Sequence, residues 1–219
     1  MKKLWIKLLC CSVFAFTCLS FSAFAASEPV NEFLFPNPLA KVVLTATDTN
    51  VDTGVVTNLA AQDVSIKSIA VELDNSVTIV GEFGFDFPTP TVSPLASDSH
   101  TSDGDIKTTL TLNYDLDTYN NKIRINSGSV RWQPKSSIYG IKDREFYIMD
   151  GQAFPFQKGI SKYPTTNYLS VTTGWGYVEK YPHVTEAATG PRATAFCKGY
   201  VIGMESAGTH EYQCILRIE

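Results

Sequence analysis

The chain has 219 residues, of which 44% are hydrophobic and 12% aromatic, and its 18 basic and 22 acidic side chains give a formal net charge of −4 at pH 7. Such an acidic chain lacks the basic surface that nucleic-acid binding requires, and it is equally unsuited to adhering to anionic lipid by charge alone. The length allows one domain with a substantial core, or two small domains.

The first 25 residues have the pattern of a secretory signal peptide. A short basic start is followed by an apolar run that ends in small residues, with Ala23 and Ala25 forming an Ala-x-Ala cleavage site. We therefore expect cleavage between Ala25 and Ala26 and a secreted location, extracellular or periplasmic. One alternative is an uncleaved membrane anchor, although the run is shorter than the roughly 18 residues of a spanning helix. The other alternative is a lipoprotein.

Cleavage changes the charge and the cysteine count. It leaves 15 basic and 22 acidic side chains, a formal charge of −7, and it removes three of the five cysteines. The remaining pair, Cys197 and Cys214, would enter an oxidising compartment, where a disulfide is the usual state of two cysteines. A two-cysteine metal site is the alternative, but the sequence has neither a Cys-x-x-Cys spacing nor a neighbouring histidine pair. We predict no membrane span in the mature chain.

Period-two alternation of apolar and polar residues dominates the mature chain, and helical periodicity is almost absent. Residues 26–39 are predicted to be an extended arm. We predict strands at 41–47, 64–73, 77–87, 106–116, 122–132, 145–149 and 167–173, with 175–180 continuing the last of these beyond Gly174. This spacing favours an all-β, mostly antiparallel β-sandwich of about eight to ten strands, Ig-like or jelly-roll-like.

Residues 88–105 are rich in Pro, Ser, Thr and Asp, which is typical of a solvated loop or of a linker. We favour a loop within a single sandwich domain over 40–219, because the strands before it would form only a marginal unit alone. The alternative is two small β units, 40–87 and 106–219.

The C-terminal stretch predicts a β-hairpin, with two strand-like runs flanking a turn of small residues. If Gly203 lies opposite Gly208, antiparallel pairing places Cys197 directly opposite Cys214. A non-hydrogen-bonded antiparallel pair is close enough for a disulfide. Register and cysteine positions therefore support a Cys197–Cys214 bridge.

A weak calcium candidate lies in the polar stretch 48–58, where Asp48, Asn50 and Asp52 alternate as in the start of a calcium loop. The glycine is displaced from the EF-hand position and the bidentate acidic ligand is missing. Turn formation by the same residues is an equally good explanation.

The candidate binding surface is aromatic. Trp175, Tyr177 and Glu179 would share one strand face, and Tyr181 is the next residue with the same orientation. The rings and the carboxylate could then hold a sugar or a hydrophobic peptide. The alternative, which we favour, is that these rings pack in the core between two sheets. Possible partners of an exposed surface are a glycan or a protein at the cell surface.

No motif for a nucleophile elbow, a zinc protease or a phosphate loop is present, and we predict no cofactor. The three histidines are His100, His183 and His210, of which His210 is the best candidate for a dispersed Ser–His–Asp site. We therefore expect an exported, non-enzymatic binding or structural protein. A secreted hydrolase with a dispersed site and a toxin-like or inhibitor module are the alternatives.

Overall fold

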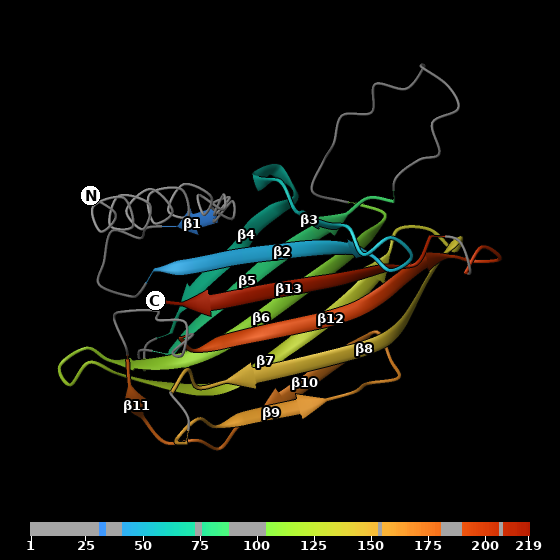
Figure 1. Cartoon of the computed structure of the whole chain (residues 1–219). Coiled ribbons are helices and arrows are strands. Elements are labelled where there is room, and N and C mark those ends of the chain that lie inside the picture. Colours follow the sequence, from blue (N-terminus) through green and yellow to red (C-terminus); the bar gives the residue numbers. More distant parts are fainter. Residues whose placement is uncertain are drawn as a thin grey trace, which may run out of the picture.

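The computed structural model describes residues 31–33, 41–72, 76–87, 104–152, 155–180, 190–205 and 208–219. Within these ranges the chain forms thirteen strands and one short 3-10 helix, η1 (Ala61–Asp63). The strands make two antiparallel sheets that pack face to face (Figure 1), which confirms the prediction of an all-β antiparallel sandwich. The predicted signal peptide and its cleavage site lie outside the described residues.

Sheet A has the strand order β1-β2-β13-β12-β8-β9, and β3 pairs with the far end of β2. Its strands are β1 (Asn31–Phe33), β2 (Val42–Asn50), β3 (Val56–Asn58), β8 (Tyr139–Met149), β9 (Gly159–Lys162), β12 (Arg192–Val201) and β13 (His210–Ile218). Part of the predicted N-terminal arm is thus strand β1, which pairs with the start of β2.

Sheet B has the order β10-β7-β6-β5-β4, and β11 pairs with the start of β7. Its strands are β4 (Val64–Val71), β5 (Ser76–Phe85), β6 (Ile106–Asp117), β7 (Lys122–Pro134), β10 (Tyr168–Thr172) and β11 (Val178–Glu179). Its strands run obliquely behind those of sheet A in Figure 1.

The core lies between the sheets and takes every second side chain of the long strands, because successive side chains of a strand point to opposite faces. On β6 the alternation predicts that Ile106, Thr108, Leu110, Leu112, Tyr114 and Leu116 share one face; the first five are fully buried, and Leu116 is partly buried against the core. The inward residues of β12 and β13 join the same cluster from the other side. The outward residues of these two strands are therefore free to form a surface.

Of the predicted loop 88–105, the structure describes only residues 104 and 105. The backbone N–H of Phe87, the residue before this segment, donates to Oδ2 of Asp105 at 3.0 Å. Strand β2, which precedes the segment, pairs with β13, and β5 pairs with β6 across it. Both sheets therefore combine strands from the two sides of the segment.

The C-terminal hairpin is present, but its predicted register is wrong by two residues. Cys197 lies opposite Tyr212, and Cys214 lies opposite Ala195. The pairing of β12 with β13 stops at Gly199 and His210, so the connection is wider than the tight turn that would set Gly203 opposite Gly208.

The disulfide predicted between Cys197 and Cys214 is absent from the structure, in which both residues are free, buried cysteines. They are diagonal neighbours on one face of two strands, not the directly opposed pair on which the prediction depended. Burial raises the pKa of the Cys197 thiol to about 12 and that of Cys214 well above its ordinary value. Both thiols are therefore protonated at neutral pH.

Among the boundaries that differ from the prediction, two concern the candidate sites. Strand β2 continues through Asn50, so that Asp48 and Asn50 belong to a strand that pairs with β13 and not to a polar loop. In the predicted strand 175–180, only Val178 and Glu179 are strand, because they alone pair with β7.

Candidate functional site

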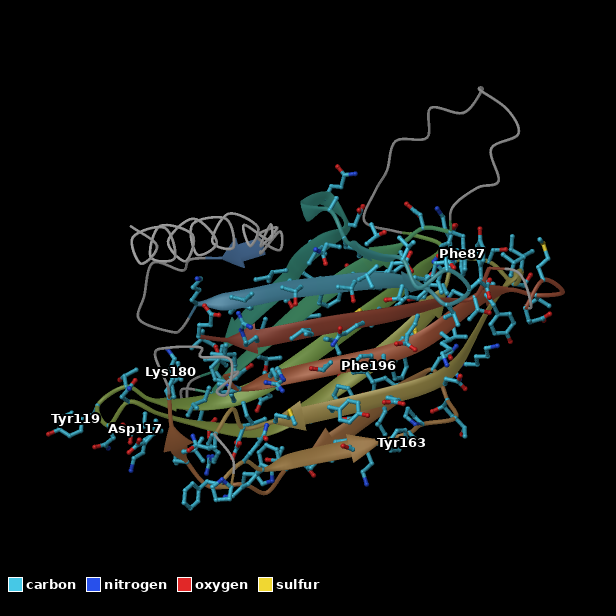
Figure 2. The ribbon with its side chains drawn as sticks, viewed as in Figure 1. Phe87, Asp117, Tyr119, Tyr163, Lys180 and Phe196 are labelled. Atoms are coloured by element: carbon cyan, nitrogen blue, oxygen red, sulfur yellow. The ribbon has the colours of Figure 1, made fainter. Side chains whose placement is uncertain are left out.

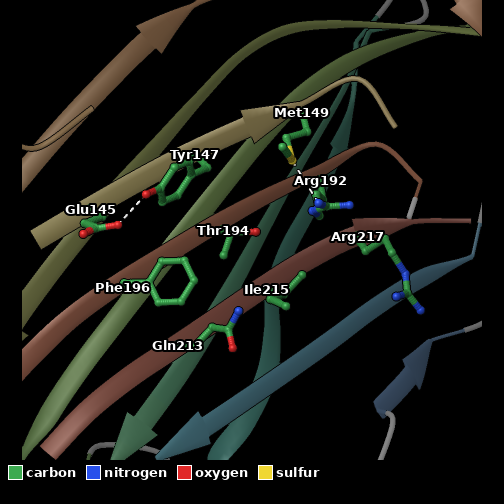
Figure 3. A pocket seen from close by; sticks show the side chains of 9 residues that line it. All are labelled: Glu145, Tyr147, Met149, Arg192, Thr194, Phe196, Gln213, Ile215 and Arg217. Atoms are coloured by element: carbon green, nitrogen blue, oxygen red, sulfur yellow. Dashed lines mark hydrogen bonds between the residues drawn. The ribbon is translucent and has the colours of Figure 1, made fainter. Parts of the chain in front are cut away.

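A pocket of about 390 Å³ lies on the outer face of sheet A, which is the face turned away from sheet B (Figure 3). The central strands β8, β12 and β13 each contribute three outward side chains to it. Their register arranges these side chains in three rows across the sheet: first Met149, Arg192 and Arg217, then Tyr147, Thr194 and Ile215, and finally Glu145, Phe196 and Gln213. We call this nine-residue surface the outer groove.

The outer groove is hollow because its central position carries a small side chain. Thr194 stands between Tyr147 on β8 and Ile215 on β13, both of which are longer. Although it points away from the core, Thr194 is only 6% exposed, because the surrounding side chains rise around it. Thr194 therefore forms the floor, and the other eight residues form the walls.

One end of the outer groove has an aromatic wall. The rings of Tyr147 and Phe196 meet edge to face, with centroids 5.7 Å apart and planes at 86°. A third ring, that of Tyr163, stands edge-on to Tyr147 at 6.4 Å. Figure 2 shows Phe196 over β12, on the outer face of sheet A. Edge-to-face contacts fix ring orientation, so this wall is pre-formed.

The same end carries the groove's carboxylate. The hydroxyl of Tyr147 donates a hydrogen bond to Oε2 of Glu145. This bond and the contact with the Tyr163 hydroxyl raise the pKa of Tyr147 above its ordinary value. Tyr147 thus stays protonated, and its hydroxyl remains a donor to the carboxylate that lies at this end of the groove.

The opposite end is cationic. Arg192 and Arg217 occupy directly opposed positions on β12 and β13, and Nη2 of Arg192 lies 2.9 Å from the sulfur of Met149. Arg217 pairs through Nη2 with Glu219. Burial lowers the pKa of the Arg192 guanidinium, and the charge of Arg217 lowers it further. The two ends of the outer groove therefore differ in the sign of their charge.

The predicted aromatic surface is divided in the structure. Trp175 packs against the hydrophobic core, whereas the ring of Tyr177 is 45% exposed and lies 4.8 Å below the guanidinium carbon of Arg124. Glu179 is exposed on β11, and Tyr181 lies outside the described residues. Trp175 and Tyr177 therefore do not form one ring platform.

The calcium candidates Asp48, Asn50 and Asp52 use their side-chain oxygens in hydrogen bonds within the protein. Oδ1 of Asn50 accepts the backbone N–H groups of Asp52 and Thr53, and a carboxylate oxygen of Asp52 accepts the N–H of Gly208. Asp48 instead turns toward His210. No group of three or more His, Cys, Asp or Glu side chains that could hold a metal ion occurs in the part of the chain that the structure describes.

His210 is only 4% exposed, and its Nδ1 lies 2.8 Å from Oδ1 of Asp48. Its Nε2 lies 3.5 Å from the side-chain nitrogen of Asn50. Within the described ranges these two are its side-chain hydrogen-bond partners, so a nucleophilic hydroxyl does not complete a triad there. His100 and His183 fall outside those ranges.

Sequence reasoning missed the outer groove. The alternation in the last hairpin does place Arg192, Thr194 and Phe196 on one face. It does not reveal that β8 lies beside them, because β8 and β12 are separated by the strands of residues 159–179. Pairing between strands distant in the sequence created the site.

The chain matches no known family model, and neither curated proteins nor solved structures give a match. Among the described residues, no helix is long and apolar enough to cross a membrane.

Proposed function

We propose that this protein is an exported, non-enzymatic binding module, a β-sandwich of Ig-like or jelly-roll-like kind, whose ligand site is the outer groove. One observation carries the proposal: three neighbouring strands direct an apolar and aromatic wall, a low floor and charged ends into one hollow of about 390 Å³. Ligand pockets have this size and this mixture of apolar surface with a few polar groups. Export rests on the signal-peptide pattern of residues 1–25.

The lining favours binding over catalysis. It contains one carboxylate, that of Glu145, and no histidine, cysteine or serine. A glycosidase-type site needs two carboxyl groups, and a covalent hydrolase needs a nucleophile beside a base. The Asp48–His210 pair does not serve the groove, because both side chains are on the opposite, inward side of sheet A.

The walls of the outer groove are held by the sheet, not by loops. Each of the nine residues belongs to a central strand with hydrogen-bonded neighbours on both sides. A site on such strands has little backbone freedom to lose on binding, which lowers the entropic cost of association. A glycan or protein partner would present a small amphipathic group to it.

The test is a ligand-observed NMR fragment screen of the mature chain, followed by titration of the hits. Thr194→Trp fills the floor without touching the core, and we expect it to weaken binding at least about tenfold. Thr111→Trp is the matched control, because it adds the same ring to the outer face of a central strand in sheet B. Circular dichroism establishes that both variants are folded.

Tyr177→Ala tests the competing aromatic surface in the same titration. Hits that survive Thr194→Trp but are lost in Tyr177→Ala would move the site to the segment around Tyr177 and overturn the proposal. Loss of the hits in Thr194→Trp alone supports the outer groove.

A further inference from the structure

We propose that the ligand of the outer groove carries an oxyanion that is bound between Arg192 and Arg217, with an apolar body extending toward Phe196. This inference rests on the proposed function and deepens it. It names the chemistry shared by carboxylates and phosphate esters, and the test below separates these two sources.

The first argument is the hydrogen-bonding state of the two guanidinium groups. Nη1 of Arg192 and Nε of Arg217 are buried, and neither has a hydrogen-bond partner among the described residues. Nη2 of Arg192 contacts only the thioether sulfur of Met149, which is a weak acceptor. A buried donor without an acceptor is costly, so these N–H groups favour an incoming oxygen.

The second argument is the unbalanced charge. Several cations elsewhere on the two sheets have carboxylate partners: Lys67 and Lys107 share Glu82, Arg124 contacts Asp115, and Lys198 contacts Asp143. Arg192 has no carboxylate partner in the described part of the chain. Glu219 is shared between Arg217 and Lys41. Among the described residues, the two arginines thus have one side-chain carboxylate partner between them, Glu219.

The third argument is the position of the two arginines. Like charges directly opposite each other on neighbouring strands destabilise a sheet, so this arrangement has a cost when the groove is empty. Figure 3 shows both side chains at the same end of the groove as Met149. An anion that accepts from both would offset the repulsion, and guanidinium groups bind planar or tetrahedral oxyanions through paired N–H donors.

The opposite end limits the ligand to one anionic group. Glu145 and Met149 are four residues apart on β8, which corresponds to about 13 Å along a strand. Phe196 and Ile215 line the space between the charged ends. A second anionic group at the far end of the ligand would meet Glu145, so the structure favours a ligand with one anionic group and an apolar body over one that is anionic at both ends.

The test uses isothermal titration calorimetry of the mature chain at low ionic strength with four probes. These are 4-phenylbutyrate, its neutral amide 4-phenylbutanamide, 4-phenylbutyl phosphate and the dicarboxylate suberate. We expect the amide and suberate to bind at least about tenfold more weakly than 4-phenylbutyrate. The phosphate arm decides whether the tetrahedral or the planar anion is preferred.

Arg192→Gln and Arg217→Gln should each weaken binding of the anionic probes about tenfold or more and leave the affinity for 4-phenylbutanamide unchanged. Lys198→Gln is the matched control, because it removes the same charge from the outer face of β12 beyond the groove. A second readout is the Nε–H resonance of Arg217, which should shift when 4-phenylbutyrate is added and not when the amide is added.

Each result decides between the proposals. Equal binding of acid and amide, abolished by Thr194→Trp, would overturn the oxyanion inference and leave the outer groove as the binding site. An equal loss in Lys198→Gln and Arg192→Gln would reduce the effect to general surface charge and would also overturn it. If no probe saturates the wild-type protein at about 10 mM, the oxyanion inference fails, and the fragment screen decides the outer groove independently.

Discussion

His210 and Asp48 form a hydrogen-bonded pair across the junction of β13 and β2, with Nδ1 of the buried imidazole 2.8 and 3.0 Å from the two oxygens of the largely buried carboxylate. The two residues are diagonal neighbours in the register, on the inward side of sheet A. The rings of Phe87 and Tyr212 enclose the imidazole. Burial raises the pKa of Asp48 above its ordinary value, and His210 opposes that rise.

We expect His210→Leu to lower the free energy of unfolding by about 3 kcal/mol at pH 7, because it leaves a largely buried carboxylate without its partner. The penalty should shrink toward pH 4. A carboxyl group whose pKa is raised in the folded state favours folding while it is protonated, and this contribution is lost as the pH rises through the folded-state pKa. Urea unfolding at pH 4 and pH 7 measures both values.

The control for this prediction is the double variant Asp48→Asn/His210→Leu, in which the carboxylate is absent. Its free energy of unfolding, measured relative to Asp48→Asn, gives the penalty that is independent of the carboxylate, and this penalty should change less between pH 4 and pH 7 than that of His210→Leu alone. A penalty of His210→Leu that does not change between pH 4 and pH 7 would contradict the role assigned to the Asp48 carboxylate.

Arg192→Gln should stabilise the ligand-free protein by about 0.5 kcal/mol at low salt, because it removes a like-charge pair between opposed strand positions. This gain in the free energy of unfolding should decrease in about 0.5 M NaCl, because salt screens the repulsion between the two guanidinium groups where they are exposed to solvent. Lys198→Gln removes an equal charge but breaks contacts with Asp143 and Glu211, so it should give no gain. Urea unfolding of the three proteins compares them, and a loss of stability in Arg192→Gln would refute the repulsion.

The two buried cysteines should titrate as free thiols. In the mature chain purified without reductant, Cys197 and Cys214 should react with a thiol reagent fully after unfolding in guanidinium, and very slowly in the native state at pH 8. Burial causes the slow reaction, because it keeps both thiols protonated and out of solvent. Absence of thiol signal after unfolding would show that a bridge forms and that the hairpin differs from the register described.

Gly199 should not tolerate a side chain. A Cβ at this position on β12 would clash with Ile106 and lie 2.6 Å from Cε2 of Tyr212. We expect Gly199→Ala to cost about 2 kcal/mol, as overpacking of a core does. Gly176→Ala is the control, because a Cβ there meets nothing within 4 Å. Thermal and urea unfolding of both variants should show a difference between them, and equal stability would contradict this packing.

The alternation of apolar and polar residues was sufficient to predict which side chains of a strand point into the core, as β6 illustrates from Ile106 to Tyr114. The partners of these strands could not. Asp48 and His210 are separated by more than 160 residues, and they meet because β2 lies next to β13. Arg192 was predicted to lie on a strand, but its position beside Met149 depends on β8 being its neighbour.

The sequence by itself determined that the chain forms two-faced strands, and it determined which side chains share a face, because burying one face requires a period of two. It did not determine the register of the last hairpin, since a slip of two residues leaves every side chain on its own face. That slip separates Cys197 from Cys214 and sets Arg192 opposite Arg217. Only the tertiary structure decided that the two cysteines are not opposed and that the two arginines are. The strand order and the width of the connection between β12 and β13 fix which residues of one face become neighbours.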